Sequence, residues 1–185
     1  MILPIYAYGQ PVLKREGDEV SREYPELDKL IDDMFETMYN ASGVGLAAPQ
    51  VGLSLKLFVV DTIQVEKEET RGKGIKKVFL NAELMEETGD EWAYEEGCLS
   101  IPDVRGEVDR LPVIRLRYQD EKFELHEETF EGINARVIQH EYDHTIGKLF
   151  IEKLGPVKKQ LIKRKLENIK RGKVSADYRL KFAKF

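Results

Sequence analysis

The segment that most constrains this chain is Gln139-His140-Glu141-Tyr142-Asp143-His144, which holds two of its three histidines. Since His140 and His144 are four residues apart, a helix places both imidazoles on one face, one turn apart. Two neutral imidazoles in that arrangement can bind one divalent metal, and Glu141 would lie beside it as a proton acceptor. The alternative is a surface helix with scattered polar residues.

The residues around this motif favour the metal. We predict a helix from about Thr129 to Ile146, ended by Gly147, with Ile133 and Val137 on the same face as the histidines. Burying two imidazoles and a carboxylate without partners is costly. A metal removes that cost because it takes the imidazole lone pairs.

A metal site needs a third protein ligand, and the sequence leaves three candidates: Cys98, His126 or a downstream carboxylate such as Glu167. Cys98 is the best chemical candidate, because a thiolate binds divalent metals strongly and Gly97 frees the backbone to approach. Its alternative role is that of a small buried hydrophobe. His126 lies in a strongly charged segment and is expected to be exposed, and Glu167 would suit a metalloprotease.

Two histidines and one cysteine leave a fourth metal position for water. The metal lowers the pKa of that water toward neutrality, which gives a bound hydroxide near pH 7. Glu141 is not needed as a ligand, so it can take a proton from the water and deliver it to a leaving group. The pattern therefore indicates a metal-dependent hydrolase.

Length and composition are those of a globular protein that stays in the cytoplasm. The 185 residues suit one domain with a real core. No apolar run approaches the roughly 18 residues of a membrane span, and the segment Met1–Tyr6 lacks the features of a signal peptide. The single cysteine excludes an internal disulfide.

Two further helices are predicted beside the one that carries the histidines. The first is opened by Pro25 and ended by Asn40 and Gly43. The other starts near Pro156 and has a basic outer face. The apolar positions of the first helix follow helical spacing: Leu27, Leu30, Ile31, Met34, Phe35 and Met38.

Strands are predicted between the helices, at residues 55–61 and 78–80 and in a hairpin that joins 112–118 to 123–125. The polar stretch 63–77 is interpreted as an exposed insertion without chemistry. Because no βα unit repeats, we predict an α+β fold. Its small antiparallel or mixed sheets would pack around the central metal-binding helix, with the first amphipathic helix and the C-terminal helix beside them.

The C-terminal part differs in charge from the rest. From Ile151 to the end there are twelve Lys or Arg and three Asp or Glu, whereas the whole chain has a net charge of −5. We predict a catalytic part at 1–155 and a basic helix and tail at 156–185 that extend the same domain. Such a tail suggests an anionic partner, and the alternative is a solvated basic helix.

Three segments resemble the signature motifs of the peptide deformylases in sequence, order and rough spacing. They are Gly43-Val-Gly-Leu-Ala-Ala-Pro-Gln50, Glu96-Gly-Cys-Leu-Ser100 and Gln139-His-Glu-Tyr-Asp-His144. The flanking segments Gly9–Leu13 and Gly147–Phe150 are also similar, so the resemblance covers roughly residues 5 to 155. Together the three motifs are highly specific.

The resemblance implies that Cys98, His140 and His144 hold a catalytic metal, typically Fe²⁺, with Zn²⁺, Ni²⁺ or Co²⁺ able to replace it. It implies that Glu141 is the general acid and base while a metal-bound hydroxide attacks the formyl carbon. The substrate would be a nascent peptide with an N-terminal formyl-methionine, and the products formate and a free amine.

Two donors for the tetrahedral oxyanion are implied as well: the side-chain amide of Gln50 and the backbone N–H of Leu99. Formyl transfer to water needs preorganised donors of this kind. Without the resemblance, Gln50 is equally well interpreted as a loop amide that caps backbone groups.

The substrate would lie along the glycine-rich segment 43–45, whose backbone can pair with an extended peptide. The alternative is a tight loop after the first helix. A methionine side chain needs an apolar pocket. Arg136 adjoins the predicted pocket face, where it would narrow or polarise the pocket, and the resemblance gives it no role. The residues expected to bind substrate are Val44, Gly45, Ile133 and Val137.

Some deformylases carry a basic tail that can contact the ribosome, and the C-terminal helix resembles it. We expect a monomer. Two other functions remain open at this point. A zinc metalloprotease would leave Cys98 and the glycine-rich segment without a role, and a non-enzymatic metal-binding or ribosome-associated module would leave Glu141 without one.

Overall fold

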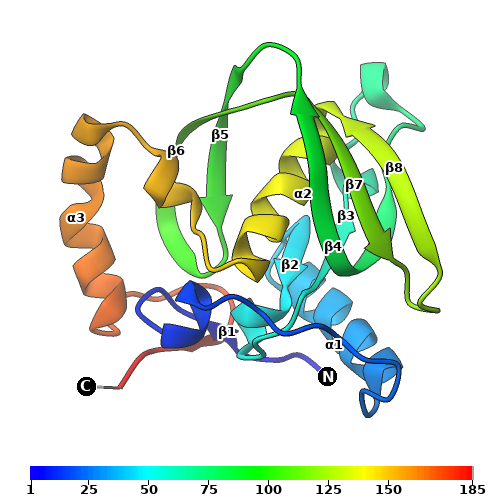
Figure 1. Ribbon diagram of the computed structural model, residues 1–185. Coiled ribbons are helices and arrows are strands. Elements are labelled where there is room, and N and C mark those ends of the chain that lie inside the picture. The colour runs from blue at the N-terminus through cyan, green and yellow to red at the C-terminus, as the bar shows by residue number, and fades with distance from the viewer. Residues whose placement is uncertain (185) are drawn as a thin grey trace.

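Strand β3, Leu57–Asp61, is buried along its whole length, and this explains how the molecule is layered. Successive side chains of a strand point to opposite faces. Accordingly Leu57 and Val59 pack with helix α1, Leu27–Asn40, while Phe58 and Val60 pack on the other side. There they meet helix α2, Gly132–Thr145, so the sheet lies between two helices in this computed structural model, which describes residues 1–184 (Figure 1).

The main sheet has five strands, all antiparallel to their neighbours, in the order β2-β3-β4-β7-β8. Strand β2 lies at one edge of this sheet, with β3 as its partner. The remaining strands are β2, Gly45–Ala47; β4, Lys76–Thr88; β7, Val113–Gln119; and β8, Leu125–Glu131.

A second, two-stranded ribbon is formed by β5, Trp92–Cys98, and β6, Ile101–Arg110. Along β6, buried and exposed residues alternate, and its buried side chains pack with helix α3, Pro156–Lys170. Helix α2 lies between this ribbon and the main sheet (Figure 1). The two sheets therefore meet on the helix that carries the histidines.

Two short strands near the ends of the chain lie side by side. Strand β1, Ile5–Tyr6, pairs in parallel with β9, Leu180–Lys181. Short 3₁₀ turns complete the connections, at Pro11–Lys14, Ala48–Val51, Ile63–Val65, Glu68–Thr70 and Phe150–Lys153. Among the described residues, no helix has both the length and the apolar character that crossing a membrane requires.

The predicted α+β class, with small sheets around the histidine helix and two further helices, is confirmed. The start of α2 was predicted three residues too early, because residues up to Glu131 pair with β7 as a strand. The 63–77 stretch contains two 3₁₀ turns and the start of β4. The last residue of the predicted tail, Phe185, lies outside the described residues.

Candidate active site

The three predicted metal ligands come together from two elements. Cys98 ends β5, whereas His140 and His144 lie one turn apart on α2, and one ligand atom from each lies within 4.8 Å of the others. The Cys98 Sγ is 3.4 Å from the His144 Nε2. Cysteine sulfur and imidazole nitrogen are the donors that divalent transition metals take in proteins.

The polar atoms around this group fit a cation. The His140 Nδ1 is engaged with a Glu96 carboxylate oxygen at 2.9 Å, which leaves its Nε2 available as a ligand. The Glu141 Oε2 is buried with no hydrogen-bond partner among the described residues. Unpartnered buried polar atoms are rare and costly, so a carboxylate beside a Cys-His-His group is well explained by a positive ion.

Burial shifts the pKa values of Glu141 and of the possible ligand His144. It raises the pKa of Glu141 from 4.5 to about 7. For His144, burial and the neighbouring His140 lower the pKa well below its usual value, which favours the neutral, metal-binding form. A carboxyl with a pKa near neutrality can both accept and return a proton.

Gly45 has a steric reason to be glycine. A Cβ at this position would lie 2.6 Å from the Glu141 Oε1 and 2.7 Å from its Cγ, closer than atoms can approach. The absence of a side chain at Gly45 therefore makes room for Glu141 against the edge strand β2. Gly45 was expected to bind substrate, and its contact with Glu141 was not predicted from the sequence.

Gln50 is held so that its amide nitrogen points at the ligand group. Its Oε1 accepts a hydrogen bond from the Ala47 N–H at 2.9 Å, which orients the amide. Its Nε2 lies 3.4 Å from the Cys98 Sγ and 3.3 Å from the Ser100 Oγ. Among residues 1–184 the Leu99 N–H donates to no other group, whereas the two Gln50 N–H donors are directed to Cys98 and Ser100.

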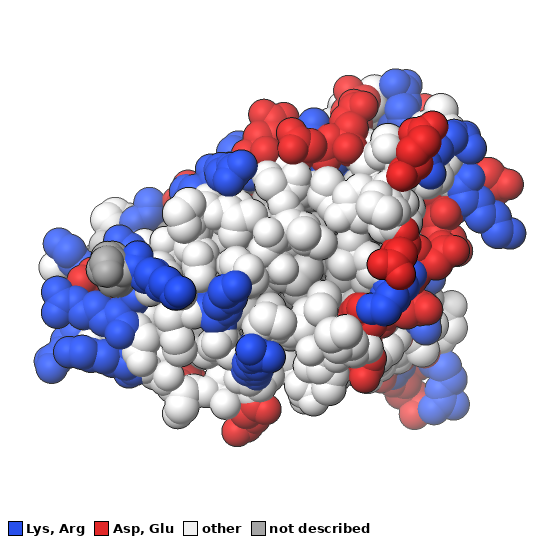
Figure 2. Space-filling model, turned by 90° about the horizontal axis from the view of Figure 1, so that it is seen from below, with Lys and Arg blue, Asp and Glu red and all other residues white. Residues whose placement is uncertain are grey.

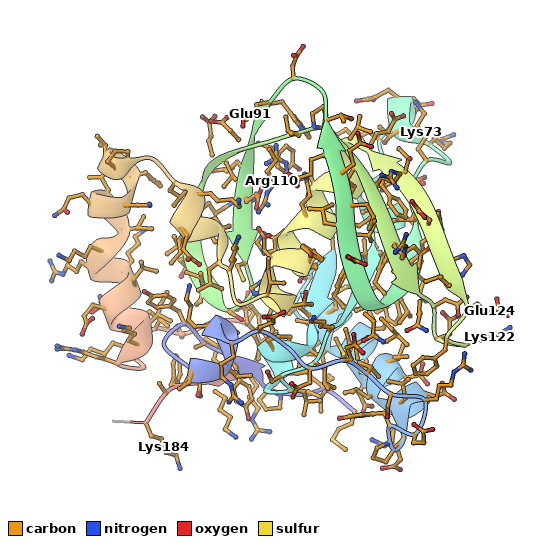
Figure 3. The ribbon with its side chains drawn as sticks, viewed as in Figure 1. Lys73, Glu91, Arg110, Lys122, Glu124 and Lys184 are labelled. Carbon is orange, nitrogen blue, oxygen red and sulfur yellow. The ribbon has the colours of Figure 1, made fainter. Side chains whose placement is uncertain are left out.

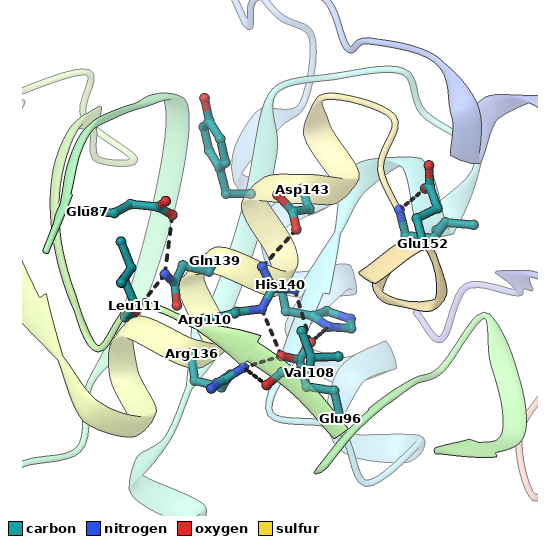
Figure 4. Close-up of polar contacts among 12 residues, drawn as sticks. Glu87, Glu96, Val108, Arg110, Leu111, Arg136, Gln139, His140, Asp143 and Glu152 are labelled. Carbon is teal, nitrogen blue, oxygen red and sulfur yellow. Dashed lines mark hydrogen bonds and ion pairs between the residues drawn. The ribbon is translucent and has the colours of Figure 1, made fainter. Parts of the chain in front are cut away.

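Beneath the ligands lies a buried network of charges centred on Glu96 (Figure 4). Its carboxylate accepts two hydrogen bonds from Arg110, at 2.8 and 3.1 Å, and one from the Arg136 Nη1 at 2.9 Å, besides the contact with His140. Arg110 also donates to Asp143 at 2.9 Å. Figure 3 shows Arg110 inside the molecule, between the ribbon and α2, whereas the other labelled charges lie at its periphery.

This network fixes the charge of Glu96. Burial by itself would raise its pKa, but hydrogen bonds from His140 and Arg110 outweigh that effect and hold the pKa far below its usual value. An ionised Glu96 in turn fixes the tautomer and ring orientation of His140. Two arginines and two carboxylates balance one another, which is the condition for keeping charges in a protein interior.

The sequence left the role of Arg136 open, and the structure pairs its charge inside the protein. Its guanidinium is directed to Glu96 and to the carbonyl oxygens of Val108 at 2.8 Å and Trp92 at 2.7 Å. It also lies 4.6 Å from the centre of the Trp92 ring, a cation–π contact. Arg136 contributes to the cavity wall, but its charge belongs to the buried network.

A cavity of about 720 Å³ opens in front of these residues. It is lined by the ligands Cys98 and His140, by Glu141 and Gln50, and by the four residues expected to bind substrate: Val44, Gly45, Ile133 and Val137. Two segments that the sequence analysis did not include also line it: Val65, from the stretch expected to carry no chemistry, and Ser175–Tyr178 near the C-terminus.

The other candidate third ligands lie elsewhere. Glu167 is on α3 and bonds to Arg171 at 3.0 Å, so the metalloprotease arrangement finds no support. His126 is half-buried, not exposed as expected, and bonds to Asp120 at 2.7 Å at the tip of the β7–β8 hairpin. Neither residue belongs to the Cys-His-His group.

The network residues Glu96, Arg110 and Asp143 received no role from the sequence. Glu96 and Asp143 stand inside quoted motifs, which was a usable signal. For Arg110 the sequence offered no such signal, because nothing in a single arginine at the end of a strand indicates burial. In the structure, the alternation of buried and exposed residues along β6 directs the Arg110 side chain inward.

Comparisons with known proteins identify the family of this chain. The sequence model of the family described as "Polypeptide deformylase" matches residues 2–160. The peptide deformylase of Flavobacterium psychrophilum is 53% identical, over 98% of this chain and 97% of that protein. That of Christiangramia forsetii is 51% identical, over 98% of this chain and 96% of the relative.

Solved structures give the same result. The peptide deformylase of Thermus thermophilus superimposes with a TM-score of 0.82 at 37% identity, covering 93% of this chain and 99% of its own. That of Legionella pneumophila does so with a TM-score of 0.81 at 39% identity, covering 94% and 98%. Matched in sequence over nearly its whole length and in fold to these enzymes, the chain belongs to the polypeptide deformylase family, which removes the N-terminal formyl group from nascent peptides.

Proposed function

We propose that this chain hydrolyses the formyl amide of formyl-methionyl nascent peptides at the Cys98-His140-His144 group, with Glu141 as general acid and base. One observation carries the proposal. Cys98, His140, Glu141 and Gln50 come from separate elements and line one cavity, and His144 lies behind them in the same group of possible ligands.

Cys98, His140 and His144 would hold one divalent metal. When bound, it would supply positive charge that stabilises the developing oxyanion and would lower the pKa of a bound water toward neutrality. A thiolate with two imidazoles suits several first-row metals. We propose Fe²⁺ as the native ion, as the family resemblance implies, with Zn²⁺, Ni²⁺ or Co²⁺ able to replace it.

The protein's own groups account for the proton transfers and the developing charge. Glu141 takes a proton from the attacking water as the new carbon–oxygen bond forms. It then gives that proton to the amine nitrogen as the carbon–nitrogen bond of the formyl amide breaks, which releases formate and the free N-terminus. The Gln50 amide and the Leu99 N–H donate to the oxyanion between these two steps.

The substrate would lie against the edge strand β2. That strand has β3 on one side and no further strand of the main sheet on the other, so its backbone can pair with an extended peptide. The methionine side chain would enter the apolar part of the cavity formed by Val44, Ile133 and Val137. Backbone pairing gives affinity without a strong choice of sequence after the first residue.

Formate release from a formyl-methionyl peptide tests the reaction. The metal-loaded protein should release one formate for each free amine formed. Glu141→Ala should bind metal normally and lose activity by about a thousandfold, since general acid–base catalysis contributes roughly 10²–10⁴. Full activity in that variant would overturn the assigned mechanism.

Metal analysis of anaerobically purified protein tests the ion. About one iron per chain is expected, and activity should fall in air through oxidation of the metal or of Cys98. Stable activity under oxygen with zinc or nickel bound would identify another native metal.

We propose that the basic face of α3 contacts the ribosome. Figure 2 shows Lys and Arg gathered at the α3 end of the molecule, and Lys159 and Lys163 are exposed there. Truncation after Leu154 is a poor test, because it would remove the core residues Ile162 and Ile169. Lys159→Glu with Lys163→Glu should weaken ribosome co-sedimentation while peptide deformylation stays unchanged, and unchanged co-sedimentation would remove the idea.

We also propose a monomer that acts in the cytoplasm, where nascent peptides emerge, with residues 1–155 as the catalytic part and 156–185 as an extension of the same domain. The pairing of β1 with β9 and the packing of α3 on β6 support a single unit. Light scattering at micromolar concentration should give the mass of one chain, about 21.4 kDa. A doubled mass would contradict the monomer.

A further inference from the structure

The turn that joins β5 to β6 consists of Leu99 and Ser100 and follows Cys98 directly. Both of its carbonyl oxygens are held from outside the ribbon. The Ser100 oxygen accepts a hydrogen bond from the Tyr8 N–H at 2.8 Å, and the Leu99 oxygen accepts one from the Tyr178 hydroxyl at 2.7 Å. Each chain end therefore holds one peptide of this turn.

The two chain ends are also fastened to each other. The Ile5 N–H donates to the Arg179 oxygen at 2.9 Å, and the Ala7 N–H to the Lys181 oxygen at 3.0 Å. The Gln10 amide donates to the Phe182 oxygen at 2.9 Å. Tyr178 directly precedes the segment that these hydrogen bonds hold against β1. Its backbone is therefore anchored, so its hydroxyl can restrain the turn.

The Tyr178 hydroxyl remains a hydrogen-bond donor throughout the physiological pH range. Burial raises its pKa to about 12, so the phenol stays protonated. The ring is half-buried and, together with Ser175, Ala176 and Asp177, forms part of the cavity wall. These residues lie beyond the 2–160 span of the family match.

We propose that Tyr178 is a positioning residue for the reaction: its bond to the Leu99 carbonyl, together with the Tyr8 bond to Ser100, fixes the turn so that the Leu99 N–H is aimed at the oxyanion. The inference rests on the proposed function, since it assigns that N–H to the developing charge. Preorganised donors lose effect when their backbone can reorient. The C-terminal segment is thereby a working part of the active site.

Tyr178→Phe tests this, because it removes one hydroxyl and keeps the ring. Tyr6→Phe is the matched control: it removes a phenolic hydroxyl from the same terminal sheet, one that accepts a hydrogen bond from the Lys181 ammonium at 3.0 Å. Kinetics with a formyl-Met dipeptide and hydrogen exchange of the residue 98–101 amides in metal-free protein are compared at a temperature where all variants are folded.

Tyr178→Phe should lower kcat about three- to tenfold with KM and metal content within twofold of wild type, the loss expected for one net hydrogen bond. Exchange of the 98–101 amides should rise about tenfold, whereas Tyr6→Phe should change neither quantity. Unchanged kcat and exchange in Tyr178→Phe would overturn the proposal, as would a loss of thermal stability alone. If wild type releases no formate, the proposed function fails instead, and the exchange rates still decide whether Tyr178 holds the turn.

Discussion

Helices α2 and α3 have 14 and 15 residues and both are rich in ionisable side chains, yet they place them in opposite surroundings. Helix α2 buries one arginine, two histidines, a glutamate and an aspartate. In α3 only Ile162 and Ile169 are buried, and its lysines face solvent. Ionisable residues are thus buried at the candidate active site in one helix and exposed to solvent in the other.

Two ion pairs make the contrast quantitative. Arg110 meets Asp143 of α2 at 2.9 Å with side chains 5% and 12% exposed, and Arg171 meets Glu167 of α3 at 3.0 Å with side chains 57% and 50% exposed. Because the two distances are alike, the contributions of these pairs to stability differ mainly through their exposure to water. Water screens the exposed pair to well below about 1 kcal/mol, whereas a buried charge that loses its partner costs several times more.

The difference in burial between α2 and α3 also bears on where the candidate site lies. Water can satisfy any charge on α3, but on α2 each buried charge needs a partner or a ligand. Among residues 1–184, four residues of α2 have a buried polar side-chain atom without a hydrogen-bond partner: Arg136, Gln139, Glu141 and His144. Glu141 and His144 lie at the candidate site, and the other two lie beside it on the same helix.

The largest effect is expected from removing Cys98, the proposed ligand that β5 places beside the two histidines of α2. Cys98→Ala should lose tight metal binding and lower formate release by at least about a thousandfold, because two imidazoles alone hold a divalent ion weakly. Metal stoichiometry after dialysis and formate assays measure both. If the variant retained one metal per chain and its activity, another residue would be the third ligand. The proposed site beside α2 would then be wrong.

The next effect probes the buried network. Arg110→Leu leaves Asp143 without its ionic partner and Glu96 without two hydrogen bonds, so the free energy of unfolding should fall by about 4 kcal/mol. Urea denaturation measures it, and Arg110→Lys, which retains the charge, should lose less. A change under about 1 kcal/mol would mean that water reaches the network and that its surroundings resemble those of α3.

Glu141 allows a test through pH. Its folded-state pKa is raised from 4.5 to about 7, so its proton is held more tightly in the folded than in the unfolded metal-free protein. Stability from this group is therefore present below pH 4.5 and lost as the pH rises to about 7. Metal-free Glu141→Gln should exceed wild type by about 3 kcal/mol at pH 8 and match it near pH 4. Parallel stability curves for the two proteins would contradict the buried, unpartnered carboxylate.

The smallest effect belongs to α3. Arg171→Leu breaks a pair of nearly the same length as that of Arg110, yet it should change the free energy of unfolding by only about 0.3 kcal/mol. Urea denaturation of Arg171→Leu and Arg110→Leu under the same conditions compares the two losses in the free energy of unfolding. Equal losses in the two variants would show that burial does not govern these pairs.

Local patterns predicted much of the fold. Helical spacing identified α1 and α3 closely, and the β7–β8 hairpin followed from alternation and turn residues. The start of α2 was misplaced because strand pairing with β7 claimed residues up to Glu131, and no local signal reports a distant pairing partner. For the same reason the strands in the acidic stretch after Leu80 were not predicted.

The sequence by itself determined the ligand chemistry, since His140, Glu141 and His144 share a helix face by the geometry of the helix alone, and Cys98 is the only thiol. Tertiary structure alone decided what surrounds them: the inward turn of Arg110, the charge of Arg136 directed to Glu96, and Tyr178 brought onto the Leu99 turn by the pairing of the chain ends. The physical reason is the separation of the interacting residues along the sequence. Helical spacing acts over one turn, whereas these contacts join residues 14, 40 and 79 positions apart, which only the packed fold brings together.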